Sequence, residues 1–315
     1  MQKNLQNFCY SDIIKAYIIK IYCKFLKINM ANQLQYIWMN GEFILQQDAN
    51  ISVLTHSLHY AGSVFEGIRA RAEHIFKLQK HIKRLLNSAA LMHLNTSYTE
   101  EELIHATKEL LRKNNLSDAY IRPIIWRRAN DLKLDSKCEV DIAIIANNSK
   151  APIIENAHLL ISKWRKTPPE VAPVQSKSSI FYAMMRIAKE EAVAKGFDDA
   201  LILDYENYIA ECTTTNIFFA KGNNLFTPIA DRFLNGITRQ TVIEIAHNLG
   251  ISVREIRINI EDLSQYDACF ATGTAIGIKT ISSIASEKQK YSFNNIKIAD
   301  LIRTEYNKLT EKEDV

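Results

Sequence analysis

The sequence predicts an α+β protein built from two domains, and three observations lead to this prediction. The 315 residues are 47% hydrophobic with only 9 Gly and 6 Pro, a composition that can form two packed cores. Residues 34–147 combine strand patterns with two helical patterns, whereas residues 158–315 are rich in short strands. Between them, residues 148–157 are polar and interrupted by a proline, which is typical of an interdomain linker.

Charge and cysteine usage exclude several classes of protein. The net charge is +4, and acidic residues are interspersed with basic ones, so no positive stripe predicts nucleic-acid binding. The cysteines are odd in number and form no C-x-x-C pair, which argues against disulfides and zinc and favours a reducing cytoplasm. His56 and His59 lack a third nearby ligand, so no metal is expected. The five cysteines are Cys9, Cys23, Cys138, Cys212 and Cys269.

Residues 1–33 are expected to be a poorly ordered extension. Lysines interrupt their apolar runs, so the stretch lacks the roughly 18 continuous apolar residues of a membrane span. It also lacks the uninterrupted apolar core of a secretory signal. Two other interpretations stay open, namely an amphipathic helix at a membrane surface and an upstream start that precedes a true initiator at Met30.

The folded part is expected to begin at Tyr36 with a hairpin. Asn40-Gly41 supplies positive φ cheaply between two apolar and aromatic runs, which marks a two-residue turn. In the stretch HSLHYAGSVFEGIRA that follows, Gly62 and Gly67 interrupt aromatic and apolar residues. This composition suits a backbone that passes close to a ligand or another chain.

Two helices and two strands complete the first domain. Residues 78–92 place apolar residues at helical spacing, and a capping box that starts at Thr99 opens a second helix, which runs to about residue 114. Residues 119–126 and 140–146 are predicted to be strands. Pro123 in the first of them predicts an edge position or a bulge, because proline cannot donate a ladder hydrogen bond.

The second domain begins with an apolar run at His158 and continues with a helix after Lys177 that ends at Gly196. A second helix is expected over residues 238–250, where Gly250 stops it. The remaining patterns predict short strands, the last of which ends in a Gly/Thr turn. These strands are predicted at 199–204, 208–211, 215–220, 225–227, 251–258 and 267–278.

Four features of the second domain converge on pyridoxal phosphate. This cofactor requires an amine, a carboxylate for its ring nitrogen and donors for its phosphate. Lys177, at a loop-to-helix junction, supplies the amine, although a single lysine is by default a surface charge. Glu211 ends a predicted strand and supplies the carboxylate. Residues 236–239 open a helix whose free amides attract phosphate, and the turn at 272–274 forms a second nest of amides.

Several motifs together resemble the class IV aminotransferases of fold type IV, and most closely the bacterial branched-chain amino acid aminotransferases. These motifs are HSLHYAGSVFEGIR, AYIRP, YIAECTTTNIFF, LNGITR and ATGTA, in the family order between Tyr36 and Ile284. The resemblance implies a small N-terminal α/β domain and a larger, strand-rich pseudo-barrel at the C-terminus. It also implies a pyridoxal-phosphate-dependent aminotransferase.

The resemblance assigns a role to each cofactor residue. Lys177 would hold the cofactor covalently and then move a proton between the substrate Cα and the cofactor, and Glu211 would face the ring nitrogen. Tyr182 would bond the phenolic oxygen, and Leu234 would pack on the ring. Arg84, the amides of Ile237 and Thr238, and Thr274 would bind the phosphate.

The resemblance also assigns the substrate site. Tyr120 and the turn Thr274-Ala275 would hold the α-carboxylate, and Arg122 would meet the distal carboxylate of glutamate. Phe65, Tyr60 and Arg69 would line or approach the side-chain pocket. The expected substrates are leucine, isoleucine or valine with 2-oxoglutarate, and the expected products are the branched 2-oxo acid and glutamate.

Alternatives within the fold are a D-amino acid aminotransferase and an aminodeoxychorismate lyase. A third alternative is a noncatalytic binding protein of the same fold. The motif AYIRP favours the branched-chain group. The resemblance further implies a homodimer as the smallest unit and leaves a hexamer open, with no nucleic acid and no membrane as partners.

Three departures from the family pattern stand out. Cys212 follows Glu211 where relatives more usually carry glycine. Ser178 and Ser179 follow the lysine where relatives commonly carry Ala or Gly, and the linker lacks the aromatic residues that relatives place over the substrate.

Overall fold

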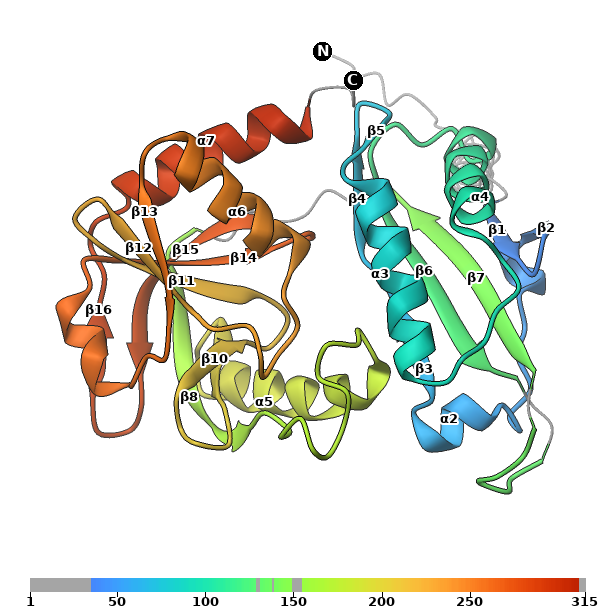
Figure 1. The fold of residues 1–315 in the computed structure, drawn as a ribbon, viewed down its shortest axis with the longest axis horizontal. Coiled ribbons are helices and arrows are strands. Elements are labelled where there is room, and N and C mark those ends of the chain that lie inside the picture. The colour runs from blue at the N-terminus through green and yellow to red at the C-terminus, as the bar shows by residue number, and fades with distance from the viewer. Residues whose placement is uncertain (1–34, 129–130, 138, 149–154, 312–315) are drawn as a thin grey trace, which may run out of the picture.

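The computed structural model describes residues 35–128, 131–137, 139–148 and 155–311 as two β-sheets with their helices, lying side by side (Figure 1). The predicted α+β content is confirmed. The expected N-terminal extension and most of the expected linker lie outside the described residues. The first sheet uses residues 36–147 and the second begins at Ala157, which supports our proposal of a domain boundary between them.

The first sheet has seven antiparallel strands in the order β2-β1-β7-β6-β4-β5, and β3 pairs with β6 beside β4. The predicted hairpin joins β1 and β2, with Asn40 at φ 50° and Gly41 at φ 96°. The seven strands are β1 (Tyr36–Met39), β2 (Glu42–Leu45), β3 (Ser63–Phe65), β4 (Ile68–Arg71), β5 (His74–Ile75), β6 (Ala119–Arg127) and β7 (Val140–Asn147).

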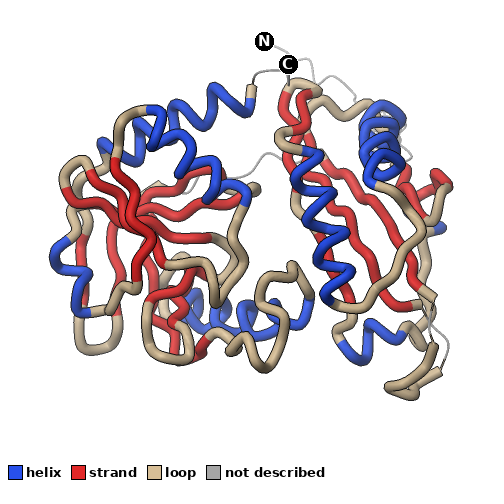
Figure 2. The backbone as a smooth tube through the Cα atoms, in the orientation of Figure 1, coloured by secondary structure: helices blue, strands red, loops and turns tan. Residues whose placement is uncertain are grey.

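Two long helices cover one face of this sheet (Figure 2). They are α3 (Leu78–Leu91) and α4 (Glu100–Lys113), as predicted, and Thr99 and Glu102 form the expected capping box. Alternate residues of β4 and β6, such as Ile68 and Ile121, pack with these helices in one core. The residues between them therefore point to the opposite face. The short helices of this part are η1 (Gln46–Asp48) and α2 (His56–Tyr60).

The expected edge position of Pro123 is wrong, because β6 lies between β7 on one side and β3 and β4 on the other. Pro123 lies opposite Glu66, where β3 has ended and β4 has not begun. The Glu66 amide donates to the Pro123 carbonyl at 2.9 Å, and proline has no N–H to return a bond. The irregularity therefore lies in the strand opposite Pro123.

The second sheet has nine strands in the order β10-β9-β8-β15-β14-β11-β12-β13, with β16 paired to β15. It is mixed, because β8 runs parallel to β9 and β15 while β14 runs antiparallel to β11 and β15. Residues from both ends of the order share one core, so the sheet curls around its own apolar face. The nine strands are β8 (Ala157–Arg165), β9 (Asp199–Leu203), β10 (Ile209–Cys212), β11 (Asn216–Lys221), β12 (Asn224–Pro228), β13 (Ser252–Ile256), β14 (Ala268–Gly273), β15 (Gly277–Ala285) and β16 (Lys290–Ser292).

Helices pack on the outside of the curled sheet (Figures 1 and 2). The helix after Lys177 starts later than expected, since η2 (Ser179–Phe181) precedes α5 (Tyr182–Ala194). The helix α6 (Ile237–Asn248) matches its prediction. The sequence patterns did not predict η3 (Glu261–Gln265), β16 or α7 (Lys297–Thr310). No helix among the described residues has the length and hydropathy needed to cross a membrane.

Candidate active site

Two adjoining cavities lie between the sheets, and Lys177 lines both of them. The smaller one extends from Lys166 and Glu211 to the start of α6. The larger one has a volume of about 560 Å³ and extends along the exposed face of the first sheet to β15. The loops that precede α5 and α6 lie on the side of the second sheet that faces the first (Figure 2).

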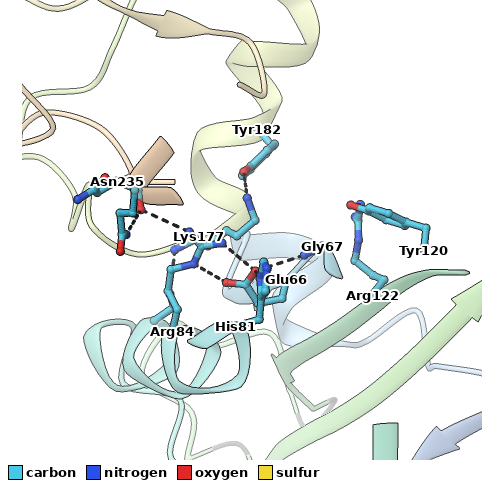
Figure 3. Close-up of polar contacts among 11 residues, drawn as sticks. Glu66, Gly67, His81, Arg84, Tyr120, Arg122, Lys177, Tyr182 and Asn235 are labelled. Carbon is cyan, nitrogen blue, oxygen red and sulfur yellow. Dashed lines mark hydrogen bonds and ion pairs between the residues drawn. The ribbon is translucent and has the colours of Figure 1, made fainter. Parts of the chain in front are cut away.

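The Lys177 amine is oriented from both sheets. Its Nζ donates to the Tyr182 hydroxyl at 2.9 Å and lies 5.3 Å from the centre of the Phe65 ring. Its backbone N–H donates to Ser88 Oγ on α3 at 3.0 Å, and its carbonyl accepts from the Phe65 amide at 3.1 Å. The lysine therefore belongs to a segment that bridges the two sheets (Figure 3).

The two serines after the lysine strengthen this bridge. Ser178 Oγ donates to the Ser63 carbonyl at 3.1 Å, and Ser179 Oγ donates to the Ala61 carbonyl at 2.7 Å. Alanine or glycine could make neither bond. The two hydroxyls therefore hold the lysine segment against Ala61 and Ser63.

Glu211 on β10 is held by two side chains. Its Oε1 lies 2.8 Å from Lys166 Nζ in a buried ion pair, and its Oε2 accepts from Asn216 Nδ2 at 3.2 Å. A carboxylate oxygen has a second lone pair, so either oxygen can still accept a bond from a ring N–H. Glu211 is therefore fixed in place and suited to face a protonated pyridine nitrogen.

Asn216 connects this end of the cavity to the loop before α6. Its amide donates to the Leu234 carbonyl at 3.1 Å, and its Oδ1 accepts from the Gly236 N–H at 3.2 Å. A Cβ added to Gly236 would lie 2.2 Å from that oxygen. Only glycine therefore allows this close approach, which sets the position of the first turn of α6.

The start of α6 is built to receive an anion. The cap residue Gly236 provides no side chain, and the amides of Ile237 and Thr238 begin a 12-residue helix at the cavity wall. In the same wall, Thr272 Oγ1 is buried without a hydrogen-bond partner. This unpaired hydroxyl, the uncapped amides and Arg84 form a donor set that fits a phosphate. The residues present therefore fit pyridoxal phosphate, which Lys177 could hold and whose ring nitrogen could donate to Glu211.

Arg84 on α3 reaches this place through a buried cluster on the helix side of the first sheet (Figure 3). Its Nε and Nη2 donate to the two oxygens of Glu66 at 2.6 and 2.8 Å, and its Nη1 lies 3.5 Å from the Asn235 carbonyl. His81 Nδ1 lies 2.8 Å from Glu66 Oε2. Burial alone would raise the pKa of Glu66, but Arg84 and His81 outweigh it and hold that pKa below its usual range. Burial lowers the pKa of His81.

The larger cavity carries the expected substrate residues. Tyr120 and Arg122 lie two residues apart on β6, so both point away from the helices and into the larger cavity. Arg122 Nη2 donates to the Tyr120 hydroxyl at 3.0 Å. The Arg122 guanidinium also lies 4.6 Å from the centre of the Phe65 ring. Arg69 on β4 donates to the Ala275 carbonyl at 2.8 Å and so contacts the turn after β14. The cavity thus combines aromatic walls with cations.

The structure places most of the predicted residues at the two cavities, with one exception. Tyr60 lines neither of them and donates its hydroxyl to the Leu132 carbonyl at 2.7 Å. The predicted residues that line the smaller cavity are Arg84, Lys177, Tyr182, Glu211, Leu234, Ile237, Thr238 and Thr274. Those that line the larger one are Phe65, Arg69, Tyr120, Arg122, Thr274 and Ala275.

Sequence reasoning missed Glu66, His81 and Lys166. A signal was present for Glu66, because it continues the alternation of Val64 and Ile68 and so points to the buried face of the sheet. A carboxylate at such a position requires a cationic partner. Lys166 follows a strand without such a pattern, so nothing in the sequence separates it from a surface lysine.

Comparisons with known proteins agree with this geometry. A family model described as amino-transferase class IV matches residues 63–284. A protein of Rickettsia bellii (strain RML369-C), named probable branched-chain-amino-acid aminotransferase, is 50% identical over 283 residues, which cover 89% of this chain and 98% of the relative.

Solved structures are similar over most of the chain. The branched-chain aminotransferase of the archaeon Thermoproteus uzoniensis, solved with norvaline, has a TM-score of 0.84 and 34% identity, covering 89% of this chain and 96% of that chain. The branched-chain amino acid aminotransferase of Thermobaculum terrenum, solved in its PLP-bound holo form, has a TM-score of 0.80 and 27% identity, covering 89% of this chain and 95% of that chain.

Proposed function

Because the chain belongs to the class IV aminotransferases, which use pyridoxal phosphate, we propose that it exchanges amino groups between branched-chain amino acids and 2-oxoglutarate. Leucine, isoleucine or valine would give the branched 2-oxo acid, and 2-oxoglutarate would give glutamate. One observation carries this proposal. Lys177 Nζ faces a cavity with a fixed carboxylate, Glu211, at one end and an uncapped helix start at the other.

The residues of the smaller cavity divide the chemistry between them. When bound, pyridoxal phosphate supplies an electron sink that acidifies the Cα proton of an amino acid. Lys177 is the base that removes this proton from the substrate Cα and then delivers it to the cofactor. A positioned amine in this role contributes roughly 10² to 10⁴ in rate. Tyr182 orients the amine through its 2.9 Å bond. Glu211, held by Lys166 and Asn216, would accept a hydrogen bond from the ring nitrogen.

The larger cavity accounts for two different substrates. A branched aliphatic side chain requires apolar walls, and Phe65 and Ile281 supply them. The distal carboxylate of 2-oxoglutarate requires a cation, and Arg122 supplies it from the same wall. Tyr120 and the 274–275 turn hold the α-carboxylate that all these substrates share.

A homodimer is the smallest assembly in this proposal. Exposed apolar side chains gather on α2, on the loop before it and on the loop after β6. The hydrogen bond from Tyr60 to the Leu132 carbonyl joins α2 to the loop after β6. Patches of this kind mark protein interfaces. Tyr60 lines neither cavity of its own chain, so its predicted role in a substrate pocket requires the pocket of a second copy of this chain. The exposed residues are Ile51, Val53, Leu54, Leu58, Tyr60, Leu132 and Leu134.

The proposed compartment is the cytoplasm. Cys212 and Cys269 are buried free thiols, which fits a reducing environment. The other three cysteines lie outside the described residues.

Half-reactions test this function directly. The purified holoenzyme is mixed in turn with L-leucine, L-glutamate and D-alanine, and the absorbance of the lysine-bound cofactor is followed. L-leucine and L-glutamate should remove this absorbance and D-alanine should leave it unchanged. Loss with D-alanine but not with L-leucine would indicate a D-amino acid aminotransferase instead.

A further inference from the structure

We propose that Glu66 is a positioning residue for cofactor binding, because it orients Arg84 toward the phosphate of the cofactor. This inference rests on the proposed function, since it requires that the smaller cavity receives a phosphate monoester. Glu66 touches neither cavity itself. Its effect on the ligand must therefore pass through Arg84.

The geometry divides the Arg84 guanidinium into two edges. Glu66 accepts from Nε and Nη2 in a bidentate pair, which fixes the plane of the guanidinium. The remaining nitrogen, Nη1, points to the Asn235 carbonyl, next to the first turn of α6 (Figure 3). The edge that Glu66 does not use is therefore the edge that faces the phosphate donors of the other sheet.

Glu66 is itself held by the first sheet and α3. Its side chain is 0% exposed, and its Oε2 accepts from His81 Nδ1 at 2.8 Å and from the Gly67 amide at 3.3 Å. Its own amide donates to the Pro123 carbonyl, in the gap between β3 and β4. The gap between β3 and β4 opposite Pro123 therefore holds Glu66, whose carboxylate reaches His81 and Arg84 on α3.

The charges of this cluster stay constant near neutral pH. Arg84 and His81 hold the pKa of Glu66 below its usual range, so the group is a carboxylate. Burial lowers the pKa of His81, so the imidazole is neutral and its Nδ1 carries the proton given to Glu66. Arg84 thus has one permanent anionic partner before any ligand binds. A long side chain that is already ordered loses less freedom when the phosphate arrives.

The test measures cofactor binding to the apoenzyme rather than activity. Apoprotein is titrated with pyridoxal phosphate and, separately, with pyridoxal, which lacks the phosphate, and binding is followed by fluorescence. Glu66→Gln preserves the shape of the side chain and removes its charge. We expect its Kd for pyridoxal phosphate to rise about ten- to hundredfold, as one lost charge-assisted hydrogen bond would cause. Its Kd for pyridoxal should change by less than about twofold, since no charge-assisted bond to phosphate is involved.

A double-mutant cycle and a matched control complete the design. If Glu66 acts through Arg84, then Glu66→Gln should weaken binding no further in an Arg84→Met background. Glu244→Gln is the control, because Glu244 on α6 pairs with Lys77 of the first sheet at 2.8 Å but lines neither cavity. Glu244→Gln should leave both dissociation constants unchanged.

Several outcomes would overturn the proposal. One is an equal loss of affinity for pyridoxal and pyridoxal phosphate in Glu66→Gln, and another is an undiminished loss in the Arg84→Met background. If Glu66→Gln does not fold, His81→Gln replaces it, because this change removes one contact of Glu66 and keeps the charge. His81→Gln should weaken the binding of pyridoxal phosphate but not of pyridoxal, and weaker binding of both ligands would refute the proposal. Wild-type apoprotein that binds neither ligand would instead refute the proposed function.

Discussion

Replacement of Gly67 by alanine should displace Tyr120 and impair substrate binding while leaving the cofactor in place. A Cβ at Gly67 would lie 2.2 Å from Tyr120 Oη and 3.0 Å from its Cζ. Because nonbonded heavy atoms settle at about 3.5 Å, the phenol must retreat by roughly 1 Å. The Arg122 to Tyr120 hydrogen bond of 3.0 Å would then break.

The size of the effect follows from these contacts. A hydrogen bond to a charged group is worth about 1.5–3 kcal/mol, and each 1.4 kcal/mol is about a factor of ten. A group displaced by about 1 Å can cost a similar factor in rate. We therefore expect kcat/KM for L-leucine to fall roughly ten- to hundredfold. Overpacking should also lower the free energy of unfolding by about 1–3 kcal/mol.

The assay combines steady-state kinetics with the cofactor spectrum and thermal unfolding. The spectrum should stay normal, because neither Gly67 nor Tyr120 lines the smaller cavity. Tyr120→Phe in the Gly67→Ala background removes the 2.2 Å contact but leaves ring carbons at 3.0 and 3.3 Å, so it should recover part of the stability but not kcat/KM. Gly62→Ala is a matched control, since its Cβ would lie 3.4 Å from the nearest atom. Unchanged kcat/KM in Gly67→Ala would refute the role given to Tyr120.

Three further predictions concern single side chains. The lowered pKa of His81 means that the unfolded chain binds a proton more readily than the folded chain, so the free energy of unfolding should fall as pH drops below about 6.5. Urea unfolding at about pH 5.5 and 7.5 measures this fall, and His81→Gln should reduce it. Lys166→Met leaves Glu211 buried without its cation, so the free energy of unfolding of the apoprotein should fall by about 3–5 kcal/mol. Cofactor binding should then raise Tm more in this variant than in wild type, and an equal rise would contradict the pairing. Arg122→Met should raise the KM for 2-oxoglutarate several-fold more than the KM for the branched 2-oxo acid, and an equal rise would remove Arg122 from the distal carboxylate.

Local signals predicted much of the fold. The turn at Asn40-Gly41 and the cap at Thr99 are determined by residues within four positions of each other, so they can be identified without knowledge of the fold. Pro123 shows the limit of such signals. Proline reports a missing donor but not which neighbouring strand accommodates it, and here the strand opposite is interrupted.

The candidate site divides in the same way. Lys177 and Glu211 could be predicted to share a cavity because their chemistry and motifs are local. The residues that hold them come from distant segments, as Lys166 reaches Glu211 across 45 positions and Ser88 reaches Lys177 across 89. No local pattern specifies such contacts, because the pairing of strands and the packing of helices bring them together.

We propose that the Lys177 amine holds the cofactor and carries the proton. Lys166 lies in the same cavity and is the rival amine. Reduction of the holoenzyme with borohydride fixes the cofactor to whichever amine holds it, and peptide mass spectrometry then locates the modified residue. The label should be on Lys177, and Lys177→Ala should lose both label and turnover. A label on Lys166, or a Lys177→Ala variant with ordinary turnover, would contradict the assignment.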